Sequence, residues 1–597
     1  FSAYGRTVRA LTNMPENRPD THLTNTNIGR RGFLGGATLV SAAALLGTDV
    51  VPGHAAERTH SIAGTTLEQV GLPASNDGYQ RIVAHKGFPL RVREDMISAK
   101  GGRDDRRTAL ASFVQVTDLH VTDVQSPMRV EFMHPLAGPA FRPQEPLGPL
   151  GTASLVRRIN SLPGGPFTGR KFDMVVSTGD NTDNHETIEL EWYLTILSGG
   201  TLTANSGSKE RWESVQTFGD KLYYNPESSI NDMYKKAGYP KVDRYFERIM
   251  KPFSSPGLQI PWYAVFGNHD DSVQGTLPSD WGLLEAMYTG DQKLMGFADE
   301  RDKQAFLTAT KGGQKVDLTN RAVSLTQHVT PDAKRRPFTP AQFIKAHLDN
   351  APAGSPAPGH GFTQNDLDAV RGYYTFQIAP GVTGISMDST NRAGYTNGSL
   401  DDVQWKWLKQ VLRAGSSTYY DDFGVRRHHQ VSDQMFILFS HHTSWTMNNL
   451  IPPMDGTGKR HGGNQLVDLL GHYPNVLAWV NGHTHNNNIV AHRNFSDARR
   501  CWWEINTASH VDFPQMGRIL EVTDNHDGTI SLFATLIESD APYQVDYDTT
   551  TPEGLASLYR EFAANDRHLG VVDHHGNRRM GKSTDQNTEL LLAHPWA

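Results

Sequence analysis

The stretch Gly482-His483-Thr484-His485 constrains this chain most, because it places two histidines directly behind an apolar run. That run, residues 475–480, is short, partly β-branched and bounded by Pro474 and Gly482, a pattern typical of a buried strand. Loops at strand ends often hold ligands, so two imidazoles one residue apart can turn toward one site. In a chain with 26 histidines, however, such a pair taken alone is more often two ordinary loop residues than a metal site.

Four further apolar segments, each typical of a buried strand, are followed closely by histidine, aspartate or asparagine. They are residues 110–117 before Asp118 and His120, 172–178 before Asp180 and Asp183, 262–266 before Asn268, His269 and Asp270, and 435–439 before His441 and His442. One such cluster could be accidental, but five in series, each behind an apolar strand, indicate a shared site. In the last of these clusters the sequence leaves open whether His441 or His442 contributes.

Composition excludes several classes of function and of metal site. The 597 residues are 37% hydrophobic and 20% charged, as in a globular protein, and the formal charge of −7 gives no basic surface for nucleic acid. No nucleic-acid partner is therefore expected. The single cysteine, Cys501, excludes an intramolecular disulfide and a cysteine zinc cluster. Ligands from His, Asp, Asn or Glu without thiolate favour Fe, Mn, Zn or Mg-type ions.

The order of patterns along the chain predicts its domain organisation. We expect a leader over 1–56, an N-terminal β-rich segment over 57–109, a main domain over 110–546, insertions near 121–151, 199–255 and 271–372, and a tail over 547–597. Prolines from Pro127 to Pro149 argue against regular helix in the first insertion and predict a long ordered loop, followed by a helix over 152–162. The polar tail is expected to run over the surface as short helices.

The leader predicts export. Arg30-Arg31 precede a weakly apolar region over 37–46 and small residues at Ala55 and Ala56, either of which fits a cleavage site. This pattern is typical of a twin-arginine signal, with the translocation machinery as a partner and an extracellular or envelope location. A stable membrane anchor is not expected, because the apolar region has about ten residues against the roughly 20 that span a bilayer.

In order, the five strand ends resemble the motifs of the calcineurin-like metallophosphoesterase superfamily. Those motifs are DxH, GDxxD, GNHD or GNHE, a lone histidine behind a strand, and GHxH, and here they span 118–485. The leader and the long insertions resemble an exported actinobacterial branch of that superfamily. The resemblance implies an α/β fold of four layers, with a central β-sandwich flanked by helices.

The resemblance also implies a centre of two divalent or trivalent metal ions, Fe, Mn or Zn. One ion would be held by Asp118, His120 and His485, the second by Asn268, His441 and His483, and Asp180 would bridge them. Two cations about 3.5–4 Å apart clamp a phosphoryl group and lower the pKa of a bridging water from about 15.7 toward roughly 7. A metal-bridging hydroxide is therefore the expected nucleophile.

Two further residues take catalytic roles in this resemblance. His269 would lie outside the metal pair as a general acid or as a donor to the phosphoryl oxygens. Asp183 would hydrogen-bond its imidazole and hold it protonated, because a neighbouring carboxylate raises the pKa of a histidine. Asp270 is expected to cap or support the loop. Asn184 stands where some phosphatases place an arginine, so the choice between phosphomonoesters and phosphodiesters stays open.

The expected function is an exported, binuclear metal-dependent phosphoester hydrolase, acting on a small-molecule or envelope phosphoester as a phosphomonoesterase or a phosphodiesterase. The alternative is a non-catalytic envelope or binding protein with a structural metal site. His269 and Asp183 favour the enzyme, because a structural site does not need an acid outside the metals.

Overall fold

The computed structural model describes residues 60–75, 77–135, 137–278, 284–297, 299–311, 324–453, 458–566, 572–573 and 576–597. The predicted leader, residues 1–56, and its twin arginine lie outside these residues. Within the described ranges, no helix combines the length and the apolar character that crossing a membrane requires.

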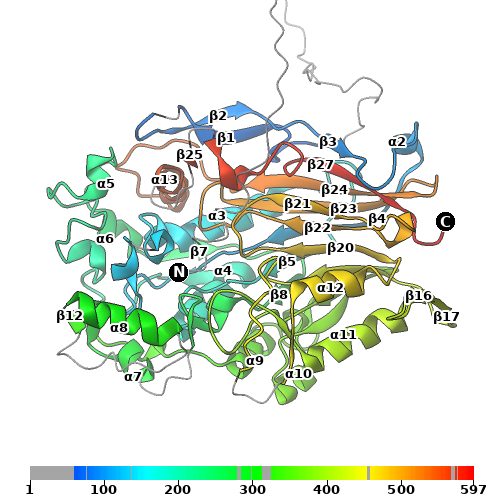
Figure 1. Ribbon diagram of the computed structural model, residues 1–597. Coiled ribbons are helices and arrows are strands. Elements are labelled where there is room, and N and C mark those ends of the chain that lie inside the picture. The colour runs from blue at the N-terminus through cyan, green and yellow to red at the C-terminus, as the bar shows by residue number, and fades with distance from the viewer. Residues whose placement is uncertain are drawn as a thin grey trace, which may run out of the picture. The chain divides into compact units, whose positions relative to one another are not determined.

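Two β-sheets form the centre of the described chain (Figure 1). The larger has seven strands in the order β3 (Arg91–Arg93), β27 (Thr588–Ala593), β24 (Thr529–Glu538), β23 (Met516–Asp524), β4 (Thr108–Val116), β5 (Met174–Thr178) and β8 (Trp262–Val265). The smaller has six, in the order β13 (Tyr374–Ala379), β14 (Val382–Ser386), β18 (Met435–Phe439), β20 (Val476–Asn481), β22 (Trp502–Asn506) and β21 (Asn488–His492). Strands β4, β5 and β8 run parallel, as do β14, β18, β20 and β22.

The two sheets pack face to face as a sandwich. Successive side chains of a strand point to opposite faces, and β18 shows this division. Met435, Ile437 and Phe439 lie in the core shared with the larger sheet, whereas Phe436 and Leu438 face the other way. Strand β4 divides its side chains in the same manner. Both faces of these strands are therefore buried, as their continuous apolar runs predict.

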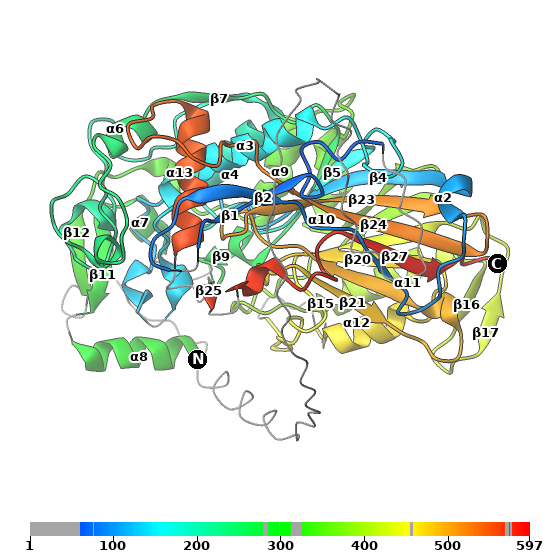
Figure 2. The same ribbon diagram turned by 90° about the horizontal axis from the view of Figure 1, so that it is seen from above.

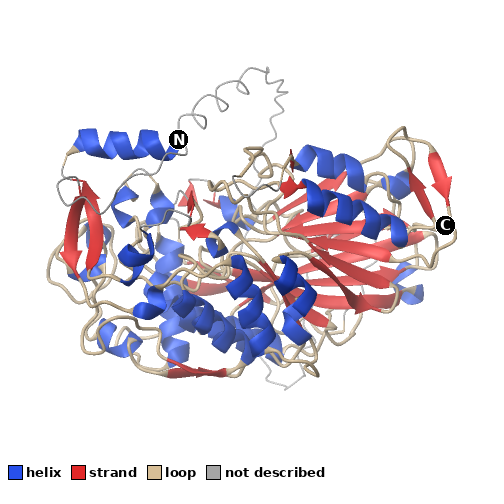
Figure 3. Cartoon of the chain, turned by 90° about the horizontal axis from the view of Figure 1, so that it is seen from below, coloured by secondary structure: helices blue, strands red, loops and turns tan. Residues whose placement is uncertain are grey.

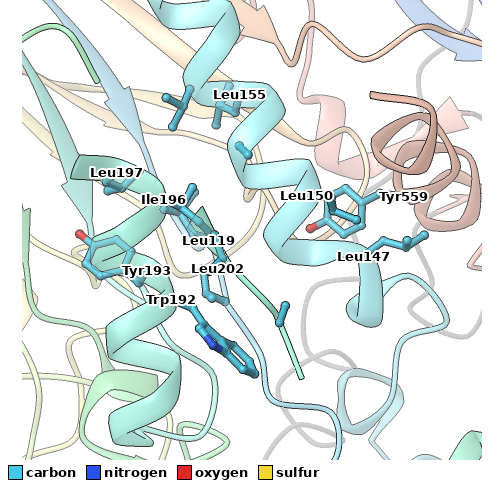
Figure 4. Packing of buried hydrophobic residues seen from close by; sticks show 14 of the residues in the cluster. Leu119, Leu147, Leu150, Leu155, Trp192, Tyr193, Ile196, Leu197, Leu202 and Tyr559 are labelled. Atoms are coloured by element: carbon cyan, nitrogen blue, oxygen red, sulfur yellow. The ribbon is translucent and has the colours of Figure 1, made fainter. Parts of the chain in front are cut away.

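Helices cover both outer faces of the sandwich (Figure 3). Helices α3 (Gly148–Ser161), α4 (Thr187–Ser198) and α13 (Pro552–Asn565) share a core with the larger sheet, and α11 (Asp402–Ala414) and α12 (Gly463–Leu470) share one with the smaller. Leu150 lies beside Tyr559 where α3 meets α13 (Figure 4). A side chain at Gly151 would overlap the Tyr559 ring, so glycine lets these helices approach closely. The predicted sandwich flanked by helices is confirmed.

Helix α3 begins earlier than the sequence predicts. It starts at Gly148 and carries Pro149 in its first turn, where a missing N–H has no helical partner to lose. The expectation that prolines exclude helix throughout 121–151 is therefore wrong at the end of that segment. Before Gly148 the segment consists of loops and the short 3-10 turns η2 (Glu131–Met133), η3 (Gly138–Ala140) and η4 (Glu145–Leu147).

The tail, residues 547–597, differs from the expected surface helices. Helix α13 is buried, and β27 pairs antiparallel with β24 and parallel with β3 inside the larger sheet. Leu555, Tyr559 and Phe562 place an apolar face of α13 in the main core, which the polar average of the tail conceals. The tail is therefore an integral part of the sandwich.

The N-terminal segment adds a hairpin above this tail. Strands β1 (Gln69–Pro73) and β2 (Ile82–Lys86) pair antiparallel and lie beside α13 (Figure 2). Val70 and Ile82 pack with Ala563 of α13. The short helix α2 (Arg103–Arg106) precedes β4.

The segments predicted as insertions contain short elements. Residues 199–255 hold β6 (Gly200–Leu202), η5 (Val215–Thr217), α5 (Met233–Lys236), α6 (Tyr245–Ile249) and β7 (Phe253–Ser255). Residues 271–372 hold β9 (Ser272–Val273), β10 (Leu277–Pro278), α7 (Leu284–Thr289), β11 (Gln292–Phe297), α8 (Glu300–Lys311), β12 (Ser324–His328), η7 (Ala333–Arg335), α9 (Pro340–Asn350), η8 (Pro358–Gly361) and α10 (Gln364–Ala369). Further short elements are β15 (Leu400–Asp401), β16 (Thr418–Tyr420), β17 (Arg426–His428), β19 (Arg460–His461), η9 (Ala498–Arg500), β25 (Val572–Asp573), β26 (Gly576–Asn577) and η11 (Arg578–Met580).

Candidate metal centre

The predicted ligands follow the carboxyl ends of parallel strands in both sheets. Asp118 and Asp180 follow β4 and β5, and His441 and His483 follow β18 and β20. The carboxyl ends of parallel strands lie at one edge of a sheet, which is where such folds hold ligands. The backbone N–H of His483 donates to the Asp118 carboxylate, 3.1 Å from Oδ2, and so joins the two sheets at this edge.

Potential ligand atoms of these residues converge. In the part of the chain that the structure describes, four groups have imidazole nitrogens or carboxylate oxygens that all lie within 4.8 Å of one another. They are Asp118 with His120 and His485, Asp118 with Asp180 and His441, His120 with Asp180 and His269, and His441 with His442 and His483. His483 joins them, because its Nδ1 lies 3.1 Å from Nε2 of His441. The structure therefore gathers the predicted histidine and aspartate ligands into one cluster.

Asp180 occupies the middle of this cluster. Its Oδ2 lies 3.0 Å from Nε2 of His441, 3.7 Å from Nε2 of His120 and 3.9 Å from Nε2 of His269. Burial by itself would raise the pKa of Asp180, yet the neighbouring histidines hold that pKa well below its usual range. A charged carboxylate in this central position can serve two cations at once.

Carboxylates on the far side orient two of the imidazoles. Nδ1 of His120 lies 2.9 Å from Oδ1 of Asp183, and Nδ1 of His485 lies 2.5 Å from Oδ2 of Asp512. A carboxylate at one ring nitrogen fixes the tautomer and aims the other nitrogen at the metal position, an arrangement common among metal-binding histidines. Nε2 of both rings therefore faces the cluster.

The choice between His441 and His442 follows from their ring contacts. Nδ1 of His441 lies 3.0 Å from the carbonyl oxygen of Thr178, which leaves Nε2 facing the cluster. Both ring nitrogens of His442 have partners elsewhere: Nδ1 lies 2.8 Å from Oγ of Ser389 and Nε2 lies 3.0 Å from the carbonyl oxygen of Thr396. The geometry therefore favours His441 as the ligand.

The backbone of the cluster adopts conformations that residues with side chains rarely take. Positive φ angles occur at Asp118 (51°), His120 (41°), Asp180 (50°), His483 (69°) and His485 (57°). Each costs of order 1–3 kcal/mol and persists only where the surrounding structure imposes it, which happens most at functional sites. The fold therefore accepts local strain to aim these side chains.

Glycines of the motifs lie in contact with the ligands. A side chain at Gly179 would overlap His441, one at Gly267 would overlap Asp180, and one at Gly482 would overlap Thr117 and Asp118. The glycines are needed here because the ligand-bearing loops approach one another more closely than a methyl group allows.

Two buried atoms of the cluster lack a hydrogen-bond partner among the described residues: Nε2 of His120 and Oδ1 of Asn268. Nδ2 of Asn268 donates to the carbonyl oxygen of Gly275 at 3.0 Å, which fixes the amide with Oδ1 as an open acceptor. A buried polar atom without a partner is costly, and an adjacent cation removes that cost. Imidazole, carboxylate and amide donors suit Fe, Mn or Zn, so these residues fit a pair of metal ions.

His269 lies at the accessible side of the cluster. Its Nδ1 lies 2.9 Å from the carbonyl oxygen and 3.1 Å from Oδ1 of Asp183, as the sequence predicts. Burial lowers the pKa of His269, but Asp180 and Asp183 outweigh that effect and raise it to about 9. The side chain of His269 is 17% exposed, against 1% for that of His120, so His269 is the more accessible of the two rings.

Asp270 supports the loop between two motifs. Its carboxylate accepts hydrogen bonds from the backbone N–H groups of Thr182 at 2.9 Å, Gly267 at 3.0 Å and Asn181 at 3.2 Å. The predicted capping role is therefore confirmed. Burial raises the pKa of Asp270 to about 6.

Several residues that support the cluster escape sequence reasoning. They are Asp512, Arg129, Arg142, Glu145 and Arg579. Arg129, Arg142 and Glu145 lie in the proline-rich segment 121–151, which the sequence identifies only as an ordered loop. Asp512 follows β22 without any motif. The sequence shows charged residues in the segments between the motifs, but it does not show which of them are buried beside the cluster and which face solvent.

Comparisons with known proteins give a family match and distant structural matches. The sequence profile of the calcineurin-like phosphoesterases matches residues 111–487. The crystal structure of a dimetal phosphatase from Danio rerio is 10% identical with a TM-score of 0.30, covering 72% of this chain and 100% of that one. A purple acid phosphatase from yellow lupin (Lupinus luteus) seeds is 10% identical with a TM-score of 0.26, covering 74% of this chain and 53% of that one. Comparison with curated protein sequences gives no match.

Proposed function

Because this chain belongs to the calcineurin-like phosphoesterase family, we propose that it hydrolyses phosphoesters at a centre of two metal ions. The position of Asp180 carries this proposal. Its Oδ2 faces imidazole nitrogens from loops of both sheets, 3.0 Å from His441 and 3.7 Å from His120. A single ion does not need a carboxylate shared between two sets of ligands, whereas a pair of ions does.

We assign the ligands as follows: Asp118, His120 and His485 to one ion, Asn268, His441 and His483 to the second, and Asp180 to both. When bound, two such ions neutralise charge on a phosphoryl group and lower the pKa of a coordinated water toward roughly 7. The protein contributes the orientation of the ligands, which the carboxylates behind His120 and His485 set before any ion arrives.

His269 supplies the proton for the leaving group. Nδ1 is held by Asp183 at 2.9 Å from its carbonyl oxygen, so Nε2 is the atom that donates. Oδ1 of Asp183 lies 3.1 Å from Nδ1 as well, and a carboxylate there favours the protonated form of the ring. A positioned acid of this kind contributes typically about 10²–10⁴-fold to the rate.

The proposed substrate is a small-molecule or envelope phosphoester. The charge of −7 gives no general attraction for polyanions. Asn184, at the position where some phosphatases have an arginine, donates instead to Oε1 of Glu189 at 2.6 Å. The amide is thereby turned toward α4, so this position lends no support to a dedicated phosphomonoester site, and both ester classes belong in the assay.

We further propose that the protein is exported and acts outside the cytoplasmic membrane, as in the exported actinobacterial branch that its leader resembles. Arg30-Arg31 and the small residues at Ala55 and Ala56 support this proposal. Substituting both arginines by lysine should abolish export in a host with a twin-arginine pathway, and mass spectrometry of the secreted protein should find a new N-terminus near residue 56. Unchanged export of the lysine variant would contradict the proposal.

The hydrolase proposal is tested by metal analysis together with kinetics. Wild-type protein should bind two ions per chain and cleave an aryl phosphomonoester, a phosphodiester or both. His269→Ala should keep both ions and lose most of the activity on an ester whose leaving group must take up a proton. A wild type that binds two ions yet cleaves neither ester class with Fe, Mn or Zn would refute a catalytic function and favour a structural metal site.

A further inference from the structure

We propose that the segment 121–151 controls the affinity of one of the two ions through a buried chain of charged side chains that ends on the outer nitrogens of His120 and His485. This inference rests on the proposed dimetal function. It assigns a positioning function to Arg129, Glu145 and Arg142, which touch neither the cluster's ligand atoms nor His269.

The first half of the chain starts at His120. Nδ1 of His120 lies 2.9 Å from Oδ1 of Asp183, and the other oxygen of Asp183 accepts from Nη1 of Arg129 at 2.8 Å. Nη2 of the same guanidinium donates to Oε2 of Glu145 at 2.8 Å. One arginine therefore joins the carboxylate behind His120 to a second carboxylate in the same segment.

The second half leads from Glu145 to His485. Nη1 of Arg142 donates to Oε1 of Glu145 at 3.1 Å, and Nε of Arg142 donates to Oδ1 of Asp512 at 2.7 Å. Oδ2 of Asp512 lies 2.5 Å from Nδ1 of His485 and also contacts Arg579. An unbroken series of hydrogen bonds thus connects the outer nitrogens of two ligands assigned to the same ion.

Burial makes this chain expensive to build. The side chain of Arg129 is 0% exposed, that of Arg142 3% and that of Glu145 1%. Transferring charges out of water costs several kcal/mol per ion, and buried ion pairs are often no more stabilising than apolar residues of the same size. Stability alone therefore does not explain the chain, whereas orientation of the two imidazoles at its ends does.

The second ion is held differently. Nδ1 of His441 meets the backbone carbonyl of Thr178 at 3.0 Å, and Nδ2 of Asn268 meets the backbone carbonyl of Gly275 at 3.0 Å. Neither partner is a charged side chain of 121–151. Breaking the charged chain should therefore weaken binding of the ion at Asp118 and leave binding of the ion at His441 unchanged.

Titration of the metal-free protein with Mn²⁺ tests this asymmetry. Wild type should bind two ions, and Arg142→Gln, which cuts the link between Glu145 and Asp512, should weaken one of them. The expected change in Kd is on the order of 10- to 100-fold, as for other residues that support a metal-binding histidine. The Kd of the second ion should stay unchanged. Glu145→Gln, which is isosteric, should raise the Kd of the same ion by a smaller factor. This variant replaces Arg142→Gln in the test if Arg142→Gln does not fold.

Two further measurements identify the weakened ion. At Mn²⁺ concentrations that fill the tighter site alone, Arg142→Gln should give the electron paramagnetic resonance spectrum of an isolated ion instead of a coupled pair. Adding His485→Ala to that variant should remove no further metal under the same conditions, whereas adding His441→Ala should remove the remaining ion. Loss of metal from the combination with His485→Ala would overturn the assignment.

Arg103→Gln is the matched control, because it breaks another buried arginine–carboxylate pair, with Glu589 of β27 at 2.8 Å, that contains none of the residues of the charged chain. It should bind both ions with wild-type affinity. Three results would each overturn the inference. Folded Arg142→Gln could bind both ions more weakly to the same extent, it could bind both as tightly as wild type, or Arg103→Gln could show the same loss of affinity. A wild type that binds fewer than two ions would instead refute the proposed dimetal function, and the inference with it.

Discussion

Gly267→Ala tests whether the central position of Asp180 matters for catalysis. The φ angle of Gly267 is −113°, which alanine adopts without strain, so the substitution acts through its methyl group alone. That methyl would lie within 3.0 Å of the backbone nitrogen and Oδ1 of Asp180, where ordinary contacts are 3.4–4 Å. Relief requires the backbone nitrogen of Asp180, and its carboxylate with it, to move by about 1 Å, and a misplacement of that size costs about 10²-fold in rate.

The assay compares kcat/KM on an aryl phosphate, metal content and thermal unfolding for Gly267→Ala and for Gly101→Ala. A side chain at Gly101 meets nothing within 4 Å, so that control should match wild type. Gly267→Ala should lose about 10²-fold in kcat/KM, lose part of its metal and remain folded, since overpacking costs about 1–3 kcal/mol. Wild-type activity with both ions bound would refute the idea that Asp180 must stay where the structure places it.

Three more predictions concern the acid, the ligand set and the pH dependence of stability. His269→Gln should reduce kcat by about 10²–10⁴-fold for an alkyl phosphoester but far less for a p-nitrophenyl ester, whose leaving group needs no proton; equal losses in steady-state kinetics would contradict an acid role. Metal analysis should find one ion in His441→Gln and two in His442→Gln, and the reverse pattern would reassign the ligand. Burial raises the pKa of Glu521 in β23 from 4.5 to about 7, so as pH rises between these values the unfolded chain loses its proton first and the folded state loses stability. The free energy of unfolding of Glu521→Gln, measured with urea, should therefore rise relative to that of wild type by about 2.5 kcal/mol between pH 5 and pH 8. A difference between the two proteins that does not change with pH would refute the raised pKa.

Features encoded within a few residues could be predicted from the sequence. The apolar run 435–439 coincides with β18, because a strand buried on both faces needs no polar residue anywhere along it. The ligands could be predicted for the same reason: each motif directly follows its strand, and parallel strands deliver their carboxyl ends to one edge. The strand ends place Asp118 and His485 at edges of two different sheets, and the resemblance to the family motifs predicts that they meet. In the structure Oδ1 of Asp118 lies 3.1 Å from Nε2 of His485.

Features that depend on distant partners could not be predicted. The burial of α13 rests on contacts such as Tyr559 with Gly151 of α3, and neither position shows this in its local sequence. Asp512 is likewise an unremarkable loop aspartate until the fold brings Arg142 to within 2.7 Å of it. Single-sequence periodicity reports which face of an element is apolar, but it cannot report which remote element covers that face.

The same distinction separates what the motifs determine from what the segments between them determine. Glycine is required at 267 and 482, because a side chain there would overlap Asp180 or Asp118. The positions of these ligands are therefore encoded in the motifs themselves. His441 needs only a backbone carbonyl behind it, which any sequence supplies. The outer nitrogens of His120 and His485 instead need carboxylates, and these carboxylates are held by arginines from 121–151. Asp183 belongs to a motif, so a chain with identical motifs and a different segment keeps this carboxylate but must hold it, and Asp512, by other means. We therefore expect affinity at this ion to depend on the insertion as well as on the motifs.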